Sequence, residues 1–448
     1  MPLSLHQEMK QQIDHTIKNA RELDQIEVLA RPGRRIALEG RYETDITWRT
    51  SGAASKRIVI DCAGARFQDL EFTIDADFVT LYGGEFKNCQ ITLLGHACRV
   101  TQTHHFEGEE GGNKDQLNCA IWLTKGASEC RVDHNLIEGW QRNAIRHTGM
   151  TKGGLDNLID HNLIRDLTRK KFKNGNEALQ IGSGRKEPRL GNINTHVVFN
   201  RFEDFTAEPE IISLKANGNY VGHNTFLDCP RSTITCRSGS RNVIESNLMI
   251  NCRGIIIYGD DNALLTNTVK HSKICEIGIR SGDAKAKQII QGKFPGAHPA
   301  AQRTDVVENV VEGQGIIIGE PGTGKIEYYD KQHFPALDTM LMRNHAKIVD
   351  AKRKLLSKGT RHVTEDPKGL QLHTKILAPV NESDVGIVPD TMTLDYMSSY
   401  AAHHMNMPAP KNGRKGPKPK DPADRMDALE ARVLDLEETL EQIGDLLD

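Results

Sequence analysis

Short apolar runs recur through the middle of the chain, and most of them end at an asparagine that is followed by a further apolar pair. Two examples are VDHNLIEG around Asn135 and VIESNLMIN around Asn247. The repeated asparagines are Asn135, Asn162, Asn200, Asn224, Asn247, Asn267 and Asn309. Their spacings of 27, 38, 24, 23, 20 and 42 residues are typical of a solenoid coil of two or three short strands, with loops inserted in the longer coils. We therefore predict an all-β chain that folds as a right-handed parallel β-helix.

The residues of each repeat have distinct expected positions in such a coil. The Val, Ile, Leu and Phe side chains beside each asparagine would point into the shared core. The asparagines would stack at a bend and bond to the coils above and below, because Asn tolerates the left-handed backbone conformation. A β-sandwich is the competing interpretation, but Asn-Gly hairpin signals between paired strands are scarce.

Both ends of the chain depart from this repeat. Residues 1–30 are predicted to form an amphipathic helix that caps the solenoid, because Leu5, Met9, Ile13 and Ile17 recur every four residues. The β-helix is predicted over residues 31–325. Residues 326–406 are predicted to be a mixed helical and irregular extension, since LDTMLMRNHAKIVDAKRKLL has a helical pattern.

The last forty residues predict self-association. Residues 407–423 are rich in Pro, Gly and Lys and indicate a linker. Residues 424–448 keep an alternating three-four spacing of apolar residues from Met426 to Leu447, which is the pattern of a short coiled coil. A single helix packed on the body is the alternative. We expect a homo-oligomer, with a trimer favoured by analogy with virion spikes.

Composition and charge narrow the class of protein. The 448 residues contain 58 Lys and Arg against 60 Asp and Glu, so there is no basic excess to bind nucleic acid. No apolar run is long enough to span a membrane. The N-terminal sequence has no apolar segment of the kind that forms a secretory signal, which favours a cytoplasmic or virion-associated protein. The nine cysteines include no Cys-x-x-Cys pair, so we expect reduced thiols packed as small apolar residues.

The strongest candidate chemistry lies in EPEIISLK, residues 208–215, and TITCRSG, residues 233–239. Glu208 and Glu210 are two residues apart, so on one strand both side chains would face the same side and suit calcium. Lys215 has the opposite parity, so a bend must bring it to the same cleft. Arg237 follows Lys215 by 22 residues, close to one coil, which would place the two side by side. A surface ladder of solvated charges is the alternative.

These stretches resemble polysaccharide lyase family 6, the β-helical family of alginate lyases and chondroitinase B. The resemblance runs from about Arg57 to Gly319 and is carried by four segments in the family's order. They are NGNEALQIG, EPEIISLKANGNYVGHNTFLDC, STITCRSGSRNVIESNLMI and GIIIYGDDN. Gln180, Ser238 and Ile256 replace residues common in the family, which bears on substrate subsites.

The resemblance implies a role for each matched residue. Lys215 matches the family's Brønsted base and Arg237 its Brønsted acid. Glu208 and Glu210 match two calcium ligands, with Asn174 as the expected third ligand and Asn176 as its alternative. The implied reaction is calcium-assisted β-elimination on an acidic, uronic-acid-containing polysaccharide, alginate foremost, which leaves a 4,5-unsaturated uronate end.

Two other functions stay open at this point. A hydrolase on the same fold could use Asp260 and Asp261 with Glu208, although neighbouring aspartates would point apart on a strand. A phage tail spike that binds or hydrolyses a host surface glycan is the other, since a missing secretion signal and a terminal coiled coil fit a virion protein.

Overall fold

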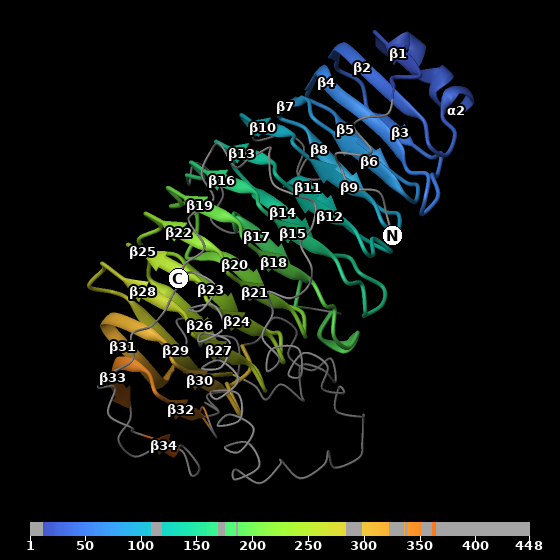
Figure 1. The fold of residues 1–448 in the computed structure, drawn as a ribbon. Helices are drawn as coiled ribbons and strands as arrows, with labels where there is room; N and C mark the ends of the chain where they lie inside the picture. The colour runs from blue at the N-terminus through green and yellow to red at the C-terminus, as the bar shows by residue number, and fades with distance from the viewer. Residues whose placement is uncertain are drawn as a thin grey trace, which may run out of the picture.

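The computed structural model describes residues 12–108, 119–168, 175–184, 187–283, 298–321, 336, 339–350 and 361–363. In these ranges, 34 strands stack coil upon coil into one parallel β-helix, with β1 and β2 at one end and β32 to β34 at the other (Figure 1). All pairings between named strands are parallel, as in β12 on β15 and β20 on β23. The predicted β-helix is therefore confirmed, while the right-handed sense of its coils stays a prediction.

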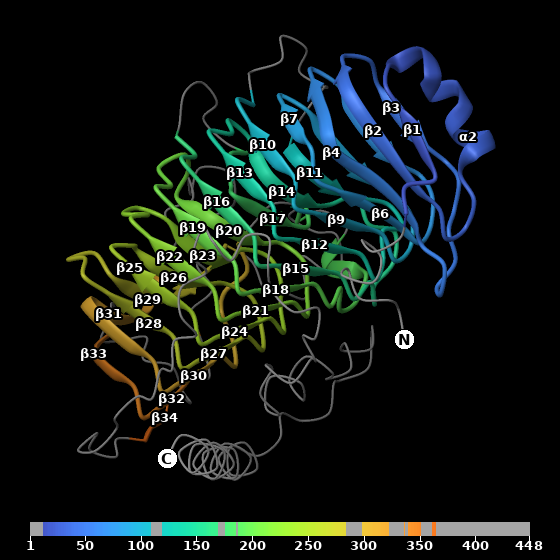
Figure 2. The same ribbon diagram turned by 45° about the horizontal axis from the view of Figure 1, so that its top comes forward.

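The strands form three sheets that run along the molecule, visible as layers in Figure 2. The first sheet contains β1 (His15–Ile17), β2 (Arg35–Tyr42), β4 (Ile58–Gln68), β6 (Val79–Tyr82), β9 (Arg99–Thr101), β12 (Arg131–Asp133), β15 (Leu158–Asp160), β18 (His196–Val198), β21 (Tyr220–Gly222), β24 (Val243–Glu245), β27 (Ala263–Leu265), β30 (Asp305–Val307), β32 (Met340–Met342) and β34 (Arg361–Val363). The second sheet contains the far end of β4 and then β7 (Glu85–Lys87), β10 (His104–Phe106), β13 (Leu136–Glu138), β16 (Leu163–Arg165), β19 (Arg201–Glu203), β22 (Thr225–Leu227), β25 (Leu248–Ile250), β28 (Thr268–Lys270), β31 (Val310–Pro321) and β33 (His345–Asp350). The third sheet contains β3 (Ile46–Trp48), β5 (Glu71–Ile74), β8 (Gln90–Leu93), β11 (Cys119–Leu123), β14 (Asn143–His147), β17 (Leu179–Ile181), β20 (Glu210–Leu214), β23 (Thr233–Cys236), β26 (Gly254–Ile257), β29 (Glu276–Ser281) and the far part of β31.

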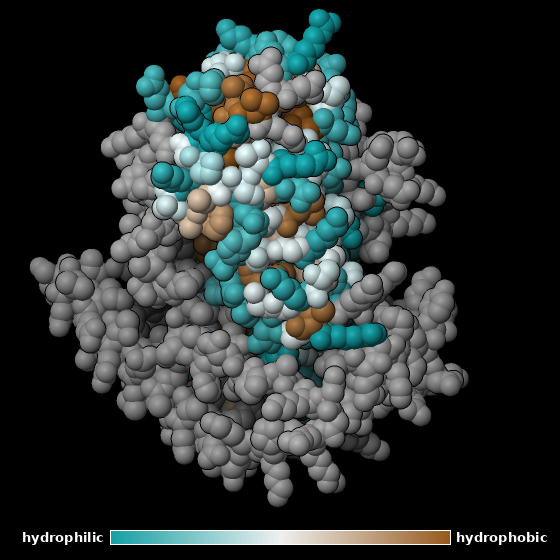
Figure 3. Space-filling view, turned by 90° about the vertical axis from the view of Figure 1, so that its right-hand side faces the viewer, coloured by the Kyte–Doolittle hydropathy of each residue, from teal (hydrophilic) through white to brown (hydrophobic). Residues whose placement is uncertain are grey.

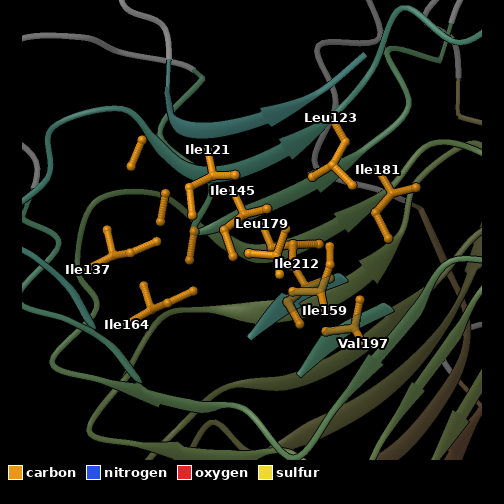
Figure 4. Packing of buried hydrophobic residues seen from close by; sticks show 14 of the residues in the cluster. Ile121, Leu123, Ile137, Ile145, Ile159, Ile164, Leu179, Ile181, Val197 and Ile212 are labelled. Atoms are coloured by element: carbon orange, nitrogen blue, oxygen red, sulfur yellow. The ribbon is translucent and has the colours of Figure 1, made fainter. Parts of the chain in front are cut away.

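The core consists of aliphatic side chains stacked in register along the axis (Figure 4). In the third sheet, Ile121 pairs with Ile145, which pairs with Leu179, and all three are fully buried. Rows of the same kind come from the other sheets, such as Val132, Ile159 and Val197 in the first. Because each coil covers the apolar edge of its neighbours, burial accumulates along the solenoid.

The predicted asparagine stack is present at the bend between the first and second sheets. The Asn135 amide donates to the Asn162 side-chain oxygen at 2.9 Å, and the same bond repeats between successive coils. In the described residues the ladder extends to Asn344, one coil beyond the predicted repeat. One expectation was wrong: the residue before each asparagine takes the left-handed conformation, as His134 does at φ 55°. The asparagine itself turns inward, where its amide can bridge two coils.

Two helical predictions are wrong where the structure describes the chain. Ile17 lies in strand β1, which pairs with β2 and extends the sheet, so ladder hydrogen bonds outweigh the weak helical pattern. Leu5 and Met9 lie outside the described residues, and the described helical turns are η1 (Ala20–Gln25), α2 (Ile26–Leu29) and η2 (Glu187–Arg189). The stretch MLMRNHAKIVD forms β32 and β33, because it repeats the apolar-Asn-apolar unit around Asn344.

Two further predictions concern the C-terminal end of the chain. The linker over 407–423 and the coiled coil over 424–448 lie outside the described residues.

None of the helices in the described part of the chain is long and apolar enough to cross a bilayer. All nine cysteines are buried and unpaired, as predicted. On the described part of the face at the right-hand side of Figure 1, hydrophilic residues are interspersed with several separate hydrophobic areas (Figure 3).

Candidate functional site

Lys215 and Arg237 occupy equivalent positions on consecutive coils of the third sheet. Each follows the last residue of its strand, and those last residues, Leu214 and Cys236, pair in register. The Arg237 backbone N–H donates to the Leu214 carbonyl at 2.8 Å. The predicted juxtaposition of the two cations is therefore what the backbone produces. The Lys215 side chain is 12 % exposed and that of Arg237 30 % exposed.

A β-bulge places Glu210 on the same face as Lys215. The register of β20 on β23 shifts between Glu210 and Ile212, and both Ile211 and Ile212 are fully buried. The extra residue reverses the alternation of side chains. The bend that the sequence required between the glutamates and Lys215 is this bulge.

Glu177, which sequence reasoning did not select, contacts Lys215 directly. The Lys215 Nζ donates to Glu177 Oε1 at 2.7 Å, and the Asn143 amide donates to the other oxygen at 3.1 Å. Burial opposes the charge of Glu177, but Lys215 and these hydrogen bonds outweigh burial and hold the pKa of Glu177 below its ordinary value. Its place in NGNE, one long coil before Lys215, was the available signal.

Glu208 and Glu210 have different surroundings. Glu208 precedes β20 rather than lying in it, is buried, and accepts the Asn176 backbone N–H at 2.7 Å. Burial, and then the negative charge of Glu177, raise the pKa of Glu208 to about 7. Glu210 accepts the Ser213 hydroxyl at 2.5 Å and the Arg237 guanidinium at 3.2 Å.

The donor types around Glu208 suit a hard cation. A buried carboxylate whose charge is opposed by a neighbouring carboxylate is the environment that calcium relieves. Asn176 is buried beside Glu208, whereas Asn174 lies outside the described residues. Within the described ranges, no group of three His, Cys, Asp or Glu side chains is arranged to hold a metal ion. The case for a calcium site therefore rests on the oxygen ligands that Glu208, Glu210 and the neighbouring asparagine offer.

An aromatic pair that the sequence analysis missed borders the two cations. Tyr258 follows β26 one coil after Arg237, and its ring stacks on His298 with centroids 4.7 Å apart. Burial, and then the charge of Arg237, lower the pKa of His298 to about 4. The spacing of 21 residues from Arg237, about one coil, could have predicted the position of Tyr258. His298 follows residues 284–297 in the chain, and no repeat of the sequence predicts its position.

The three positions at which the sequence departs from the lyase pattern lie around the row formed by Lys215, Arg237 and Tyr258. Gln180 pairs with Ser213 in register, is buried, and donates to the Gly182 carbonyl at 2.8 Å. Ile256 lies in register with Gln180 and Ser213, two coils beyond Ser213, and is 7 % exposed. Gly184 has φ +75°, and a Cβ there would lie 3.2 Å from the Ser238 hydroxyl, so the backbone passes close to the site.

The carboxylates of the hydrolase alternative are occupied elsewhere. Asp260 and Asp261 do not point apart as expected, because both bind the Arg303 guanidinium, at 3.0 and 2.6 Å. This guanidinium binds both carboxylates and offsets one of their two negative charges, which argues against their use as acid and base.

A comparison with protein families matches residues 17–271 to the chondroitinase B family. No curated protein matches the chain. Among solved structures, a PL6 alginate lyase bound to a trisaccharide is similar with a TM-score of 0.61 at 16% identity, over 76% of this chain and 80% of that one.

Two further solved structures are similar. A mannuronic acid specific family 6 lyase from human gut microbiota gives a TM-score of 0.58 at 18% identity, over 75% of this chain and 83% of its own. The PL6 polysaccharide lyase Pedsa3628 from Pseudopedobacter saltans gives 0.57 at 17% identity, over 78% and 88%. At these identities the likeness shows a shared fold.

Proposed function

The chain belongs to the chondroitinase B family of polysaccharide lyases, and from this membership we propose that it cleaves a uronic-acid-containing polysaccharide, alginate foremost, by β-elimination. The observation that carries the proposal is the pairing of Lys215 and Arg237 on consecutive coils. A base and a stabilising cation for the leaving oxygen are the two groups that this reaction needs from the protein.

Lys215 has the position of the base. As a neutral amine it can donate one N–H to Glu177 and present its lone pair to the C5 proton of the bound uronate. The bond of 2.7 Å to a side chain that is 1 % exposed fixes the direction of the amine. This orientation reduces the loss of conformational freedom on reaching the transition state.

Arg237 supplies positive charge where the C4–O4 bond breaks. Glu210 holds its guanidinium at 3.2 Å, while 30 % of the side chain remains exposed for contact with substrate. Charge that is positioned before the reaction stabilises the developing oxyanion without reorganisation.

The acidic residues beside these cations would hold calcium. Glu208, Glu210 and either Asn174 or Asn176 would be its ligands. When bound, calcium neutralises the substrate carboxylate and so makes the C5 proton easier to remove. Some of the negative charge of Glu177, Glu208 and Glu210 would be offset in the same way.

The mass of the products tests this proposal. Elimination gives a new chain end that is one water lighter than the end left by hydrolysis. Mass spectrometry of alginate oligosaccharides after digestion should show the lighter ends with the wild-type chain. Products that carry the added water would establish a hydrolase and contradict the proposal.

A further inference from the structure

The outer face of the first sheet changes from charged to apolar along the solenoid. In β9 and β12, the residues that alternate with the core positions include Arg99, Arg131 and Asp133, which form ion pairs. Farther along, from β18 to β32, most positions in register with these hold apolar side chains. These side chains form a cluster separate from the main core. We call it the outer apolar cluster, and it includes Val198, Tyr220, Val243, Leu265, Val307 and Met342.

The outer apolar cluster is buried although it faces away from the core. Val198 and Tyr220 are fully buried, and Met340, the most exposed member, is 7 % exposed. This burial is found in a single chain, so a second copy is not needed to produce it. In the described ranges, the partly buried apolar residues that pack against the cluster are Leu158 and Phe199. Both lie at its N-terminal end, so most of the cover must come from another segment of the same chain.

The surface that the cluster offers outward is apolar, because buried polar groups on this face pair within it. The Tyr220 hydroxyl donates to Glu245 Oε2 at 2.8 Å, and both residues are buried. A buried tyrosine ring whose hydroxyl already has a partner presents apolar surface to whatever lies over it. The segment that covers the cluster must therefore bring apolar side chains of its own.

The last described strand of the chain lies at the end of this same face. Strand β34 pairs with β32, at the C-terminal end of the cluster. Residues 364–406 follow β34 directly and lead to the Pro- and Lys-rich stretch over 407–423. The strands from β18 to β32 are about 4.8 Å apart and together span roughly 24 Å, a length that about eight extended residues cover. Residues 364–406 are therefore long enough to pass along the whole cluster more than once.

The sequence of residues 364–406 supplies the apolar side chains that such a cover needs. Its apolar stretches are LQLHTKIL at 370–377, VGIV at 385–388 and MTLDYM at 392–397. Proline and acidic residues lie between them, at APVNESD and PD. The segment can thus place several apolar groups on one face while its polar residues stay in water.

The main competitor for this position is the insertion over residues 284–297. It joins Asp283 to His298, and the Asp283 N–H donates to the His298 carbonyl at 2.8 Å. Both ends of the insertion therefore lie at one coil, so it would have to leave and return at the same point. Residues 364–406 follow a described strand at one end only, so they can run along the solenoid axis.

We propose that residues 364–406 pack along the outer apolar cluster and run from β34 back toward β18. The proposal does not depend on the lyase assignment. Lys215 and Arg237 follow strands of the third sheet, so a cover on the first sheet does not occupy their side of the coil. The cover would also fix where the predicted linker and coiled coil leave the body, which is beside the first sheet.

Photo-crosslinking of the full-length chain tests this cover. Photo-leucine has nearly the shape of leucine and replaces it throughout the chain, so Leu265 becomes a probe within the cluster. After irradiation, a denaturing gel separates single chains from linked pairs, and mass spectrometry identifies the linked peptides. We expect Leu265 to link to residues 364–406 in the single-chain band. Leu227, on the second sheet in the same part of the solenoid, is the internal control and should not link to this segment.

A substitution in the full-length chain provides a second readout. The variant replaces apolar residues of the first stretch by serine: Leu370→Ser, Leu372→Ser, Ile376→Ser and Leu377→Ser. Its matched control replaces polar residues of the same segment, Glu382→Ser with Asp384→Ser. We expect the first variant to raise the fluorescence of the dye anilinonaphthalene sulfonate several-fold, because the cluster becomes exposed. The control should not, and circular dichroism should show an intact β-helix in both.

Three outcomes would overturn the proposal. Links from Leu265 to residues 284–297, or to any segment other than 364–406, would assign the cover elsewhere. Links found only in the band of paired chains would make the cluster an interface between copies. Dye fluorescence that is as high in the wild-type chain as in the serine variant would show that residues 364–406 do not shield the cluster.

Discussion

At the scale of single residues, the β-bulge in β20 and the stacking of consecutive coils decide which charged side chains of the site pair with each other. Lys215 contacts Glu177, and Arg237 contacts Glu210, so each cation is held by a different carboxylate. Glu208 has no cation of this kind among its described hydrogen-bond partners and accepts a backbone N–H. Of the two glutamates proposed for calcium, Glu210 therefore also pairs with Arg237, whereas Glu208 has no such ion pair in the described residues.

Replacing either member of the cation pair should abolish turnover without unfolding the chain. Lys215→Ala and Arg237→Ala should each lower kcat by at least about 100-fold, because each removes a group that acts only in the transition state. Both side chains lie on the outer face of the coil, so both variants should stay folded. The melting temperature of Arg237→Ala should stay close to the wild-type value, whereas that of Lys215→Ala should fall, because the buried Glu177 carboxylate loses its partner. Lys18→Ala, at the N-terminal end, is the matched control. A wild-type rate in either site variant would reject its assignment.

Calcium should be required for activity. Chelation of divalent ions should abolish the release of unsaturated ends, and added calcium should restore it, because the uncompensated substrate carboxylate disfavours loss of the C5 proton. Isothermal titration with calcium should detect binding to the wild-type chain and much weaker binding to Glu208→Gln. Full activity in excess chelator would contradict the calcium assignment and leave the elimination untouched.

At the scale of elements, the bends between sheets hold the coils in register. Asn224 illustrates the ladder: its amide donates to the Asn247 side chain at 3.0 Å and to the Val197 carbonyl at 2.8 Å, and its oxygen accepts from Asn200. Nearby, Asp133 and Asp160 are buried with Arg99 and Arg131. Burial opposes the charge of Asp160, but Arg131 outweighs it and keeps the pKa of Asp160 below its ordinary value.

Asn224→Ala should lower the free energy of unfolding by about 3 kcal/mol, since it leaves several buried groups unpaired at about 1–3 kcal/mol each. Asn19→Ala is the control, because Asn19 is exposed to solvent and its amide donates to Glu22 outside the ladder. Denaturant titration of both variants measures the difference. Equal destabilisation would show that the ladder is not a main source of stability.

Asp160→Asn should be destabilising at neutral pH by about 2–3 kcal/mol, because it removes the buried carboxylate that accepts two hydrogen bonds from the Arg131 guanidinium. The pKa of Asp160 is lowered by folding, so its contribution is present above the unfolded value of about 3.9 and is lost as pH falls below it. Urea titrations at neutral pH and near pH 3 should therefore show a penalty that shrinks in acid. The exposed pair Arg41–Glu43 provides the control Glu43→Gln. A penalty that is independent of pH would contradict the pairing.

Much of this architecture could be predicted from the repeat, because each ladder asparagine is in the same position relative to apolar neighbours. The same pattern was missed around Asn344, where a helical spacing of apolar residues overlapped a strand unit. Lys215 and Arg237 were found because one coil separates them. The spacing places Glu177 one long coil before Lys215, but their contact also depends on side-chain direction. The position of His298 depends on a loop that returns to the coil, which spacing does not predict.

At the scale of the whole molecule, the proposed oligomer concerns the C-terminal heptads over 424–448. Burying their apolar seam requires partner helices, and the Pro- and Lys-rich stretch over 407–423 would separate them from the body. The location of the protein, on a virion or in the cytoplasm, also remains a prediction. A trimeric spike that carries three lyase bodies would bind a polymer at several points.

Light scattering on the full chain and on a chain that ends near Met407 measures this association. We expect a trimer for the full chain and a smaller species for the shortened one. A monomeric full chain would contradict the coiled coil, and an unchanged oligomer after shortening would move the interface to the β-helix.

The proposed activity is an elimination across a uronate ring. It is measured most directly by the ultraviolet absorbance of unsaturated uronate ends during incubation with alginate and with chondroitin sulfate, with Lys215→Ala as the blank. We expect a steady rise with alginate for the wild-type chain and none for the variant. New reducing ends without any rise in absorbance, or no cleavage of either polymer with calcium present, would contradict it.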